Sequence, residues 1–310
     1  MKLNRKSISF LVLAISMALI FLLLKDKLGE IKDITNIKIT DFLIISLFVF
    51  GTILTNGLKN KILIKVFNID INFTEWFGLS AVNTLWNYLP FQGGAIAKGI
   101  YFKKKYDFQY SSYLALLTTS YGITISSLGL LGCLTLVISY FLAGYFSMFI
   151  LFIFLLFFIG PLGVLFFVYY KDSHVKFSWP VLTRLIDGIK EIIKNKKIIF
   201  LLIAIDIVTA VFFALRLYCA GQALHFAIPF IFFLLVAPII MLSIFLPLTP
   251  GGLVLREAVV GIFASWLMVN VSDSVVITVL DRGIALIWIF LLGSIFHFIL
   301  SHKVISRYVK

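Results

Sequence analysis

Long apolar stretches separated by short polar loops are the dominant pattern along the chain. Seven of them are continuous, at 7–24, 42–58, 112–140, 146–170, 198–224, 226–246 and 274–300. Each is close to or above the roughly 20 residues that a helix needs to cross the hydrocarbon core of a bilayer. Two further apolar segments, 76–102 and 247–270, are interrupted by proline and glycine. The pattern predicts an all-α polytopic membrane protein with about 7–8 transmembrane helices and one or two re-entrant broken segments.

Composition supports a membrane protein over a soluble one. Of the 310 residues, 61% are hydrophobic and 13% are charged, whereas soluble domains are roughly 45–50% apolar and about 25% charged. The amino-terminal segment has a basic start and an apolar run, as a signal peptide does. No small-residue cleavage site precedes Lys25, so we expect 7–24 to be retained as a first span.

The formal net charge of +13 is carried largely by short loops between the apolar stretches. This placement is typical of the positive-inside rule and of contact with anionic lipid, and it argues against nucleic-acid binding. The longest basic loop, 171–197, and both termini are therefore predicted to be cytoplasmic in a multi-pass protein of the cell membrane. The loop 25–41 has four lysines and four acids, so it is free to face outward.

Parity of the crossings constrains the broken segment 76–102. If it crossed completely, the spans 112–140 and 146–170 would place the basic loop 171–197 outside. We therefore expect 76–102 to enter the membrane and return to the side of Lys103, Lys104 and Lys105. Backbone that is not helical is tolerated at this depth only where it is buried in protein or lines a wet cavity.

The loop 171–197 contains a helical stripe of apolar residues opposite a charged face, which predicts an interfacial amphipathic helix. The stripe consists of Val181, Leu182, Leu185, Ile186, Ile189, Ile192 and Ile193. We expect this helix to connect two halves of a single integral membrane domain covering 1–310. The halves would span about 40–170 and about 198–300.

Two broken segments share a motif, which suggests an internal repeat. Residues 89–99 read LPFQGGAIAKG and residues 246–257 read LPLTPGGLVLRE. Both have Leu-Pro, a short spacer, Gly-Gly, three apolar residues and a cation, Lys98 or Arg256. Downstream, 118–124 aligns loosely with 279–285. Paired interruptions in two halves of a membrane protein indicate a binding site at the repeat interface. Charge alone leaves parallel and inverted repeats both open.

The shared motif has the chemistry of an anion site. Proline ends the incoming helix and Gly-Gly permits a close turn. The next helix then begins with unpaired N–H groups and a positive dipole end. A kinked helix with snorkelling cations is the structural alternative. The candidate head-group residues of the two motifs are Pro90, Gly93, Gly94, Lys98, Pro247, Pro250, Gly251, Gly252 and Arg256.

Further polar residues within the apolar segments extend the candidate site. Ionisable groups inside a membrane are expensive and usually face a cavity or pair with one another. Arg256 and Arg282 would bind a phosphate with Glu257 and Asp281 orienting them, or the four would only neutralise one another and hold helices together. Asn83 and Asn87 would line a head-group pocket or belong to an interfacial belt. Asp206 and Arg216 are ten residues apart and are interpreted as structural. No catalytic, metal or cofactor signature occurs in the sequence.

Three segments carry a family resemblance: NTLWNYLPFQGGAIAKG from Asn83, PLTPGGLVLREA from Pro247, and DRGIALIWI from Asp281. They resemble the transmembrane-region family of lysylphosphatidylglycerol synthases over roughly residues 40–300. Val254 stands where that family often has glycine, and Ser120-Tyr121 stand where it often has Glu-Arg. The resemblance implies the lipid-handling membrane part of these synthases and not their soluble aminoacyl transferase domain.

The sequence and the resemblance together favour a flippase-like protein that binds and translocates an anionic lipid head group, phospholipid or polyprenyl-linked glycolipid. A non-enzymatic role is favoured because no transferase domain is recognised. The alternatives are an integral membrane transferase with Glu257 or Asp281 as base, a transporter of a small polar metabolite, and an accessory subunit that recruits a soluble transferase or synthase.

Overall fold

The computed structural model describes residues 37–88, 93–170, 180–243, 245, 255–267 and 269–308, and these residues form ten α-helices and no strand. The all-α prediction is confirmed. The expected first span at 7–24 and most of loop 25–41 lie outside the described residues. The helices are α3 (Ile39–Lys65), α4 (Phe73–Trp86), α5 (Gly93–Tyr106), α6 (Tyr110–Ala143), α7 (Met148–Tyr170), α8 (Pro180–Lys194), α9 (Lys196–Ala223), α10 (Phe230–Ser243), α11 (Leu255–Trp266) and α12 (Val271–Tyr308).

Five described helices are long and apolar enough to cross a membrane: α3, α6, α7, α9 and α12. They confirm the spans expected at 42–58, 112–140, 146–170, 198–224 and 274–300. The stretch 226–246 differs, because only 14 of its residues form a helix, α10. At 1.5 Å per residue such a helix covers about 21 Å, less than the roughly 30 Å of hydrocarbon. The prediction of seven to eight complete crossings is therefore not confirmed within the described residues.

The segment 76–102 is broken as predicted, into α4 and α5. A capping box starts α4, in which Asn72 accepts from the backbone N–H of Glu75 and the Glu75 carboxylate accepts from that of Asn72. Lys105, in the last turn of α5, forms an ion pair with Glu75, in the first turn of α4. The two helices are thus antiparallel, and the chain returns to the end at which it entered.

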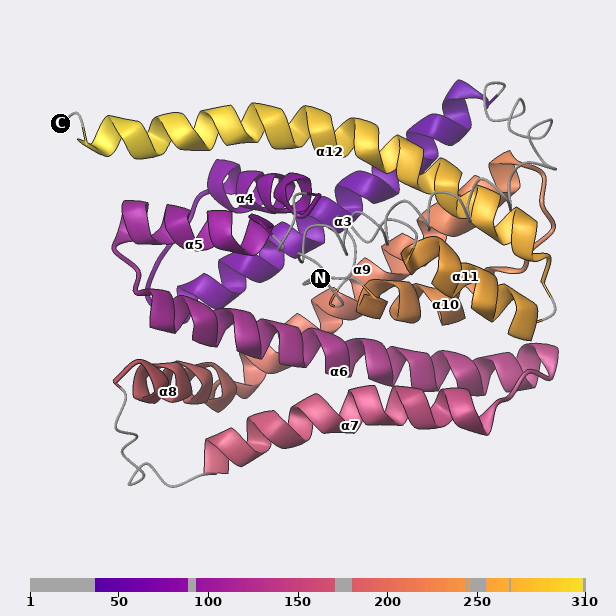
Figure 1. The fold of residues 1–310 in the computed structure, drawn as a ribbon, viewed down its shortest axis with the longest axis horizontal. Coiled ribbons are helices and arrows are strands. Elements are labelled where there is room, and N and C mark those ends of the chain that lie inside the picture. Colours follow the sequence, from indigo (N-terminus) through magenta and orange to yellow (C-terminus); the bar gives the residue numbers. More distant parts are fainter. Residues whose placement is uncertain are drawn as a thin grey trace, which may run out of the picture.

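The helices α10 and α11 form a second short pair. Figure 1 shows α4 and α5 near the end of the molecule that holds the C-terminus, and α10 and α11 near the opposite end. The C-terminal end of α11 lies beside the α6–α7 turn, since Tyr145 donates to the carbonyl of Leu267 and the rings of Phe149 and Trp266 are 6.0 Å apart. The two broken segments therefore lie at opposite ends of the helix bundle.

The long helices α3 and α9 cross antiparallel through the middle of the bundle (Figure 1). Their facing residues run in opposite directions: Lys59 meets Asp206, Thr55 meets Thr209, and Thr52 meets Arg216. Around this crossing, α12 packs on α4, and α6 packs on α10 and α7. This arrangement brings polar residues of α3 and α9 into the interior.

The helix α8 confirms the predicted amphipathic helix in 171–197, although 171–179 lie outside the described residues. It packs against α6 through buried Ile189, Ile192 and Ile193. A Cβ built on Gly188 would lie 2.7 Å from the Cβ of Ala115 on α6, so the two helices approach closely. Val181 and Leu182, at the start of the stripe, are exposed. The C-terminal part of the apolar stripe is therefore buried against the protein, and its N-terminal part is exposed at the surface.

Candidate functional site

The interior of the bundle contains an unusual number of ionisable side chains. Among the described residues, five cations and four carboxylates are buried, where each unpaired charge is expensive. The cations are Lys59, Lys98, Arg216, Arg256 and Arg282, and the carboxylates are Glu75, Asp206, Glu257 and Asp281. Glu75 pairs with the partly buried Lys105, so the other eight groups, if all are ionised, carry two positive charges in excess. This excess favours an anionic ligand.

Asp281 is the centre of one group. Its side chain is fully buried on α12, and Arg216 of α9 binds it through two N–H···O contacts, Nε–Oδ1 at 2.8 Å and Nη2–Oδ2 at 3.0 Å. Arg256 of α11 donates to the same Oδ2. Both guanidinium groups lie over the ring of Phe213, at 4.6 Å for Arg256 and 5.2 Å for Arg216. One carboxylate therefore joins three helices, and both its oxygens accept hydrogen bonds, which disfavours a role as a general base.

Glu257 and Arg282 form a neighbouring pair between α11 and α12, with Arg282 Nη1 at 2.8 Å from Glu257 Oε1. Glu257 Oε2 and Arg256 Nε are buried and have no hydrogen-bond partner in the described part of the chain. Buried polar atoms are nearly always satisfied, so these two mark places for a ligand or water. The four charges predicted from the sequence do pair with one another, and Arg216 joins them.

A second group surrounds Lys59 on α3. Its ammonium lies 2.7 and 2.8 Å from the two carboxylate oxygens of Asp206 on α9 and also donates to Thr124 of α6. The predicted span 42–58 ends one residue before Lys59, whereas α3 continues to Lys65 and only 6% of Lys59 is exposed. A carboxylate and a hydroxyl thus satisfy the buried side chain of Lys59.

Lys98 differs from the other buried cations. It is 8% exposed, and within the described residues its ammonium makes one polar contact, to Asn60 Oδ1 at 3.3 Å, and none to a carboxylate. It lies on α5, one turn after the helix start at Gly93 and Gly94. A Cβ on Gly94 would lie 2.6 Å from Asn87 Oδ1 and 2.8 Å from Asn83 Oδ1. Glycine is therefore needed for α5 to begin against the end of α4.

The structure sorts the predicted site residues into two places. Asn83, Asn87, Gly93, Gly94 and Lys98 meet where α4 ends and α5 begins. Arg256, Glu257, Asp281 and Arg282 meet between α11 and α12. The remaining predicted residues, Pro90, Pro247, Pro250, Gly251 and Gly252, lie outside the described residues.

A polar seam along the α3–α9 crossing connects the two places. It consists of the Lys59–Asp206 pair, the hydrogen bond at 2.8 Å from Thr209 Oγ1 to Thr55 Oγ1, and the 3.5 Å contact from Arg216 Nη1 to Thr52 Oγ1. Lys59 and the three threonines were not among the site residues predicted from the sequence, and Asp206 and Arg216 were interpreted as structural. Their signal was present, since Thr52, Thr55 and Thr209 lie one to two helical turns from a buried charge in otherwise apolar spans.

A further cluster lies at the lysine-rich end of the bundle, outside the five spanning helices. Burial alone would raise the pKa of Glu75, but hydrogen bonds from Lys105, Tyr101 and Tyr106 and from the backbone N–H of Asn72 hold it below its ordinary value. Tyr101 donates to Glu75 Oε1 at 2.7 Å and Tyr106 at 3.0 Å. The ionised carboxylate thus ties α4 to the end of α5.

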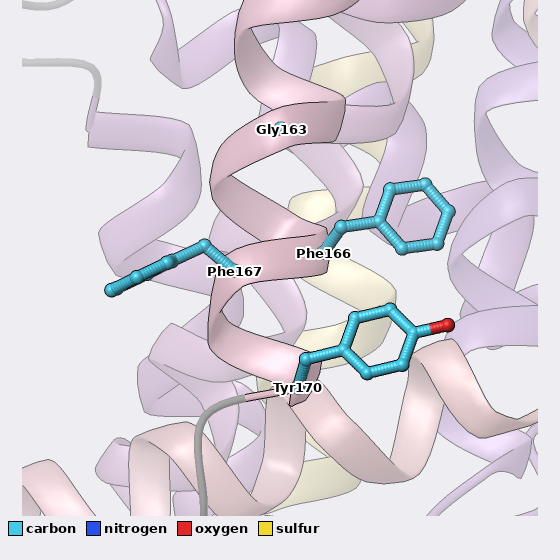
Figure 2. Close-up of a pocket in the computed structure, with 4 residues that line it drawn as sticks. All are labelled: Gly163, Phe166, Phe167 and Tyr170. Carbon is cyan, nitrogen blue, oxygen red and sulfur yellow. The ribbon is translucent and has the colours of Figure 1, made fainter.

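The surface hollow drawn in Figure 2 lies away from these charges. It is lined by Gly163, Phe166, Phe167 and Tyr170 of α7, and Figure 2 shows the three aromatic side chains projecting outward from the helix. Each of these rings is at least half exposed. An apolar hollow on an apolar, exposed helix fits contact with lipid chains and holds no head-group chemistry.

Apolar helices of spanning length around a buried ion-pair cluster define a multi-pass α-helical membrane protein. Within that class, the chain belongs to the family described as Lysylphosphatidylglycerol synthase TM region, whose model matches residues 9–293. The resemblance inferred from the motifs is confirmed. A search of curated proteins found no match, and neither did a search of solved structures.

Proposed function

We propose that this protein binds the anionic head group of a membrane lipid in its interior and carries it between the two leaflets. The observation that carries the proposal is the excess of buried cations over buried carboxylates, together with Lys98, whose ammonium contacts no carboxylate among the described residues. A phosphate would supply the missing negative charge. Membership of a family named for a lipid-modifying synthase supports a lipid as its source.

We infer further that the two halves are inverted repeats, with α3, α4, α5 and α6 corresponding to α9, α10, α11 and α12. The pairings support this: α3 packs on α4 as α9 packs on α10, and α4 packs on α12 as α10 packs on α6. The corresponding helices α6 and α12 run in opposite directions (Figure 1). Each broken pair then enters from its own side of the membrane. Sites between such repeats are typical of transporters that open alternately to either side.

In this proposal the head group passes from one broken pair to the other along the polar seam, while its acyl chains stay in the lipid. Lys98 and Arg256 each lie four residues after the second glycine of a Gly-Gly pair. Each would bind the phosphate when its own side is open. The basic termini and the loop 171–197 would face the cytoplasm, in a protein of the cell membrane.

Transport in proteoliposomes tests the proposal. The purified chain is reconstituted with fluorescent phosphatidylglycerol, its lysyl ester, a polyprenyl-phosphate sugar or phosphatidylcholine, and a membrane-impermeant reductant reports which leaflet holds the label. We expect exchange of at least one anionic lipid. Lys98→Ala and Arg256→Ala should each slow it by about tenfold or more, since roughly 1.4 kcal/mol of lost binding corresponds to tenfold.

Lys104→Ala is the matched control, because Lys104 is an exposed cation on the same helix as Lys98. It should exchange lipid at the parent rate. Folding of every variant is checked by thermal unfolding in detergent. Absence of exchange with every lipid by the folded parent protein would contradict translocation.

A further inference from the structure

We propose that the lipid phosphate binds in the first half of the molecule, between Lys59 and Lys98, at the position that the carboxylate of Asp281 occupies in the second half. This inference rests on the proposed function and assigns its primary anion site. The class of ligand is a phosphate monoanion or diester. In the second half, the carboxylate of Asp281 occupies the position at which the first half would bind the phosphate.

The correspondence follows from positions along matching helices. Lys59 lies 20 residues after Ile39, the start of α3, and Arg216 lies 20 residues after Lys196, the start of α9. Ser120 lies 10 residues after Tyr110, the start of α6, and Asp281 lies 10 residues after Val271, the start of α12. The Gly-Gly motifs align Lys98 with Arg256. Three pairs of helices thus carry these groups at matching positions.

The two halves differ at one member of this set. In the second half, Asp281 lies between Arg216 and Arg256 and binds both. In the first half, both cations are present, but the residue that matches Asp281 is Ser120, which is neutral. Lys59 instead binds Asp206, and Lys98 contacts only the amide oxygen of Asn60 within the described part of the chain. The first half therefore has the cations of the second without the shared anion.

The neighbouring ion pair shows that the first half has not simply lost single charges at random. Glu257 and Arg282 bind each other in the second half. The counterpart of Glu257 in the first half is Gly99, because each lies five residues after the second glycine of its Gly-Gly pair. The counterpart of Arg282 is Tyr121, which directly follows Ser120. Here both partners are uncharged, so no charge is left over. Lys98, in contrast, is kept as a buried cation that contacts no carboxylate in the part of the chain that the structure describes.

Burying Lys98, of which only 8% is exposed, without a carboxylate partner among the described residues is expensive. A bound phosphate offsets that penalty, as Asp281 does for Arg256. The amide oxygens of Asn83 and Asn87 lie beside the start of α5, one turn before Lys98, and each of these side chains also carries an N–H donor that could reach a phosphate. Ser120 is partly exposed, and its neighbour Thr124 donates to its carbonyl at 2.8 Å. A hydroxyl leaves room that a carboxylate would fill.

Supplying the missing carboxylate tests the assignment. In Ser120→Asp the new carboxylate should occupy the anion position and bind Lys98, whereas Ser120→Asn changes size in the same way without charge. The full-length chain in detergent is titrated calorimetrically with dihexanoyl phosphatidylglycerol, dihexanoyl phosphatidylcholine and inorganic phosphate. We expect the parent and Ser120→Asn to bind phosphatidylglycerol within about twofold of each other, and Ser120→Asp to bind it about tenfold or more weakly. Binding of inorganic phosphate with equal affinity would identify free phosphate and not a lipid as the ligand, and would overturn the lipid assignment.

The pair Lys98→Gln and Lys98→Arg keeps the test decisive if Ser120→Asp fails to fold. Loss of binding in Lys98→Gln with retention in Lys98→Arg supports the site. Equal binding by Ser120→Asp and Ser120→Asn, in a protein that still exchanges lipid in proteoliposomes, would overturn the first-half site and leave the proposed function intact. A parent chain that neither binds nor exchanges lipid would overturn both.

Discussion

At the scale of single residues, the carboxylate of Asp281 separates two buried guanidinium groups. Replacing it by asparagine in Asp281→Asn removes the charge and keeps the shape. Arg216 and Arg256 would then face each other without compensation. Breaking a buried pair in this way costs about 3–5 kcal/mol, so we expect a large fall in the melting temperature in detergent.

Asp107→Asn is the matched control for that measurement. Asp107 pairs with Lys103 on the surface, where its side chain is 86% exposed, and such pairs contribute little. Its melting temperature should stay close to that of the parent. If Asp281→Asn melted with the control, Asp281 would not have the structural role that its contacts indicate.

Glu75 makes the joint between α4 and α5 sensitive to pH. Its folded-state pKa is held below the ordinary value of 4.5. A lowered pKa means that the ionised carboxylate stabilises the fold above pH 4.5, and that this contribution is lost as the pH falls through the folded-state pKa. The melting temperature of the parent should therefore exceed that of Glu75→Gln at neutral pH, and the two should converge in acid. A difference that is constant with pH would exclude ionisation of Glu75 as its cause.

Sequence alone identified many of the buried charges, but it suggested partners only for the four on α11 and α12. Asp206 and Arg216 were recognised as ionisable residues in an apolar span and interpreted as structural. Their partners, Lys59 and Asp281, lie 147 and 65 residues away in the sequence. No helical periodicity relates residues so far apart. The pairs became visible only when the contacts of α9 with α3 and with α12 were known.

At the scale of helices, the contact between α6 and α7 depends on Gly129. A Cβ built there would lie 2.5 Å from the backbone nitrogen of Phe158. Backbone atoms cannot rotate away as a side chain end does, so Gly129→Leu must push the two helices apart. We expect it to lower the melting temperature strongly, because overpacking of a close contact costs about 1–3 kcal/mol of stability or more.

Gly160→Leu is the control, because nothing lies within 4 Å of a Cβ built on Gly160 of α7. It adds the same side chain to an open face and should melt like the parent. Equal destabilisation by both variants would point to a general intolerance of leucine in this helix pair and would contradict close packing at Gly129.

Helix lengths show which of the predicted spans the apolar pattern identified correctly and which it did not. Continuous apolar stretches such as 198–224 and 146–170 gave spanning helices, the second in spite of Pro161 inside α7. The stretch 226–246 is equally apolar, yet its helix α10 covers only Phe230–Ser243. An internal proline does not explain the difference, because α10 also continues through Pro238. Hydropathy measures the surroundings of a segment and not whether it crosses.

At the scale of the whole molecule, charge and parity predicted the return of 76–102 without any structure. They could not decide between crossing and return for 226–270. Two complete crossings and two half-length helices both bring the chain back to the same side, and both satisfy the basic loops. The position of α10 and α11 at the end opposite α4 and α5 (Figure 1) favours two half-length helices and the inverted arrangement.

Labelling of single cysteines from outside the cell tests that arrangement. In a background with Cys133 and Cys219 replaced by serine, Lys104→Cys marks the end of α5 and Asn270→Cys marks the turn between α11 and α12; both positions are exposed. If the broken pairs open on opposite sides, an impermeant maleimide should label residue 270 in intact cells and residue 104 only after permeabilisation. Labelling of both from the same side would contradict inverted repeats, because α5 and α11 would then end at the same face. The reverse pattern would keep the repeats and place the basic loops outside, against the positive-inside rule. The two positions therefore separate the internal symmetry of the molecule from its orientation in the membrane.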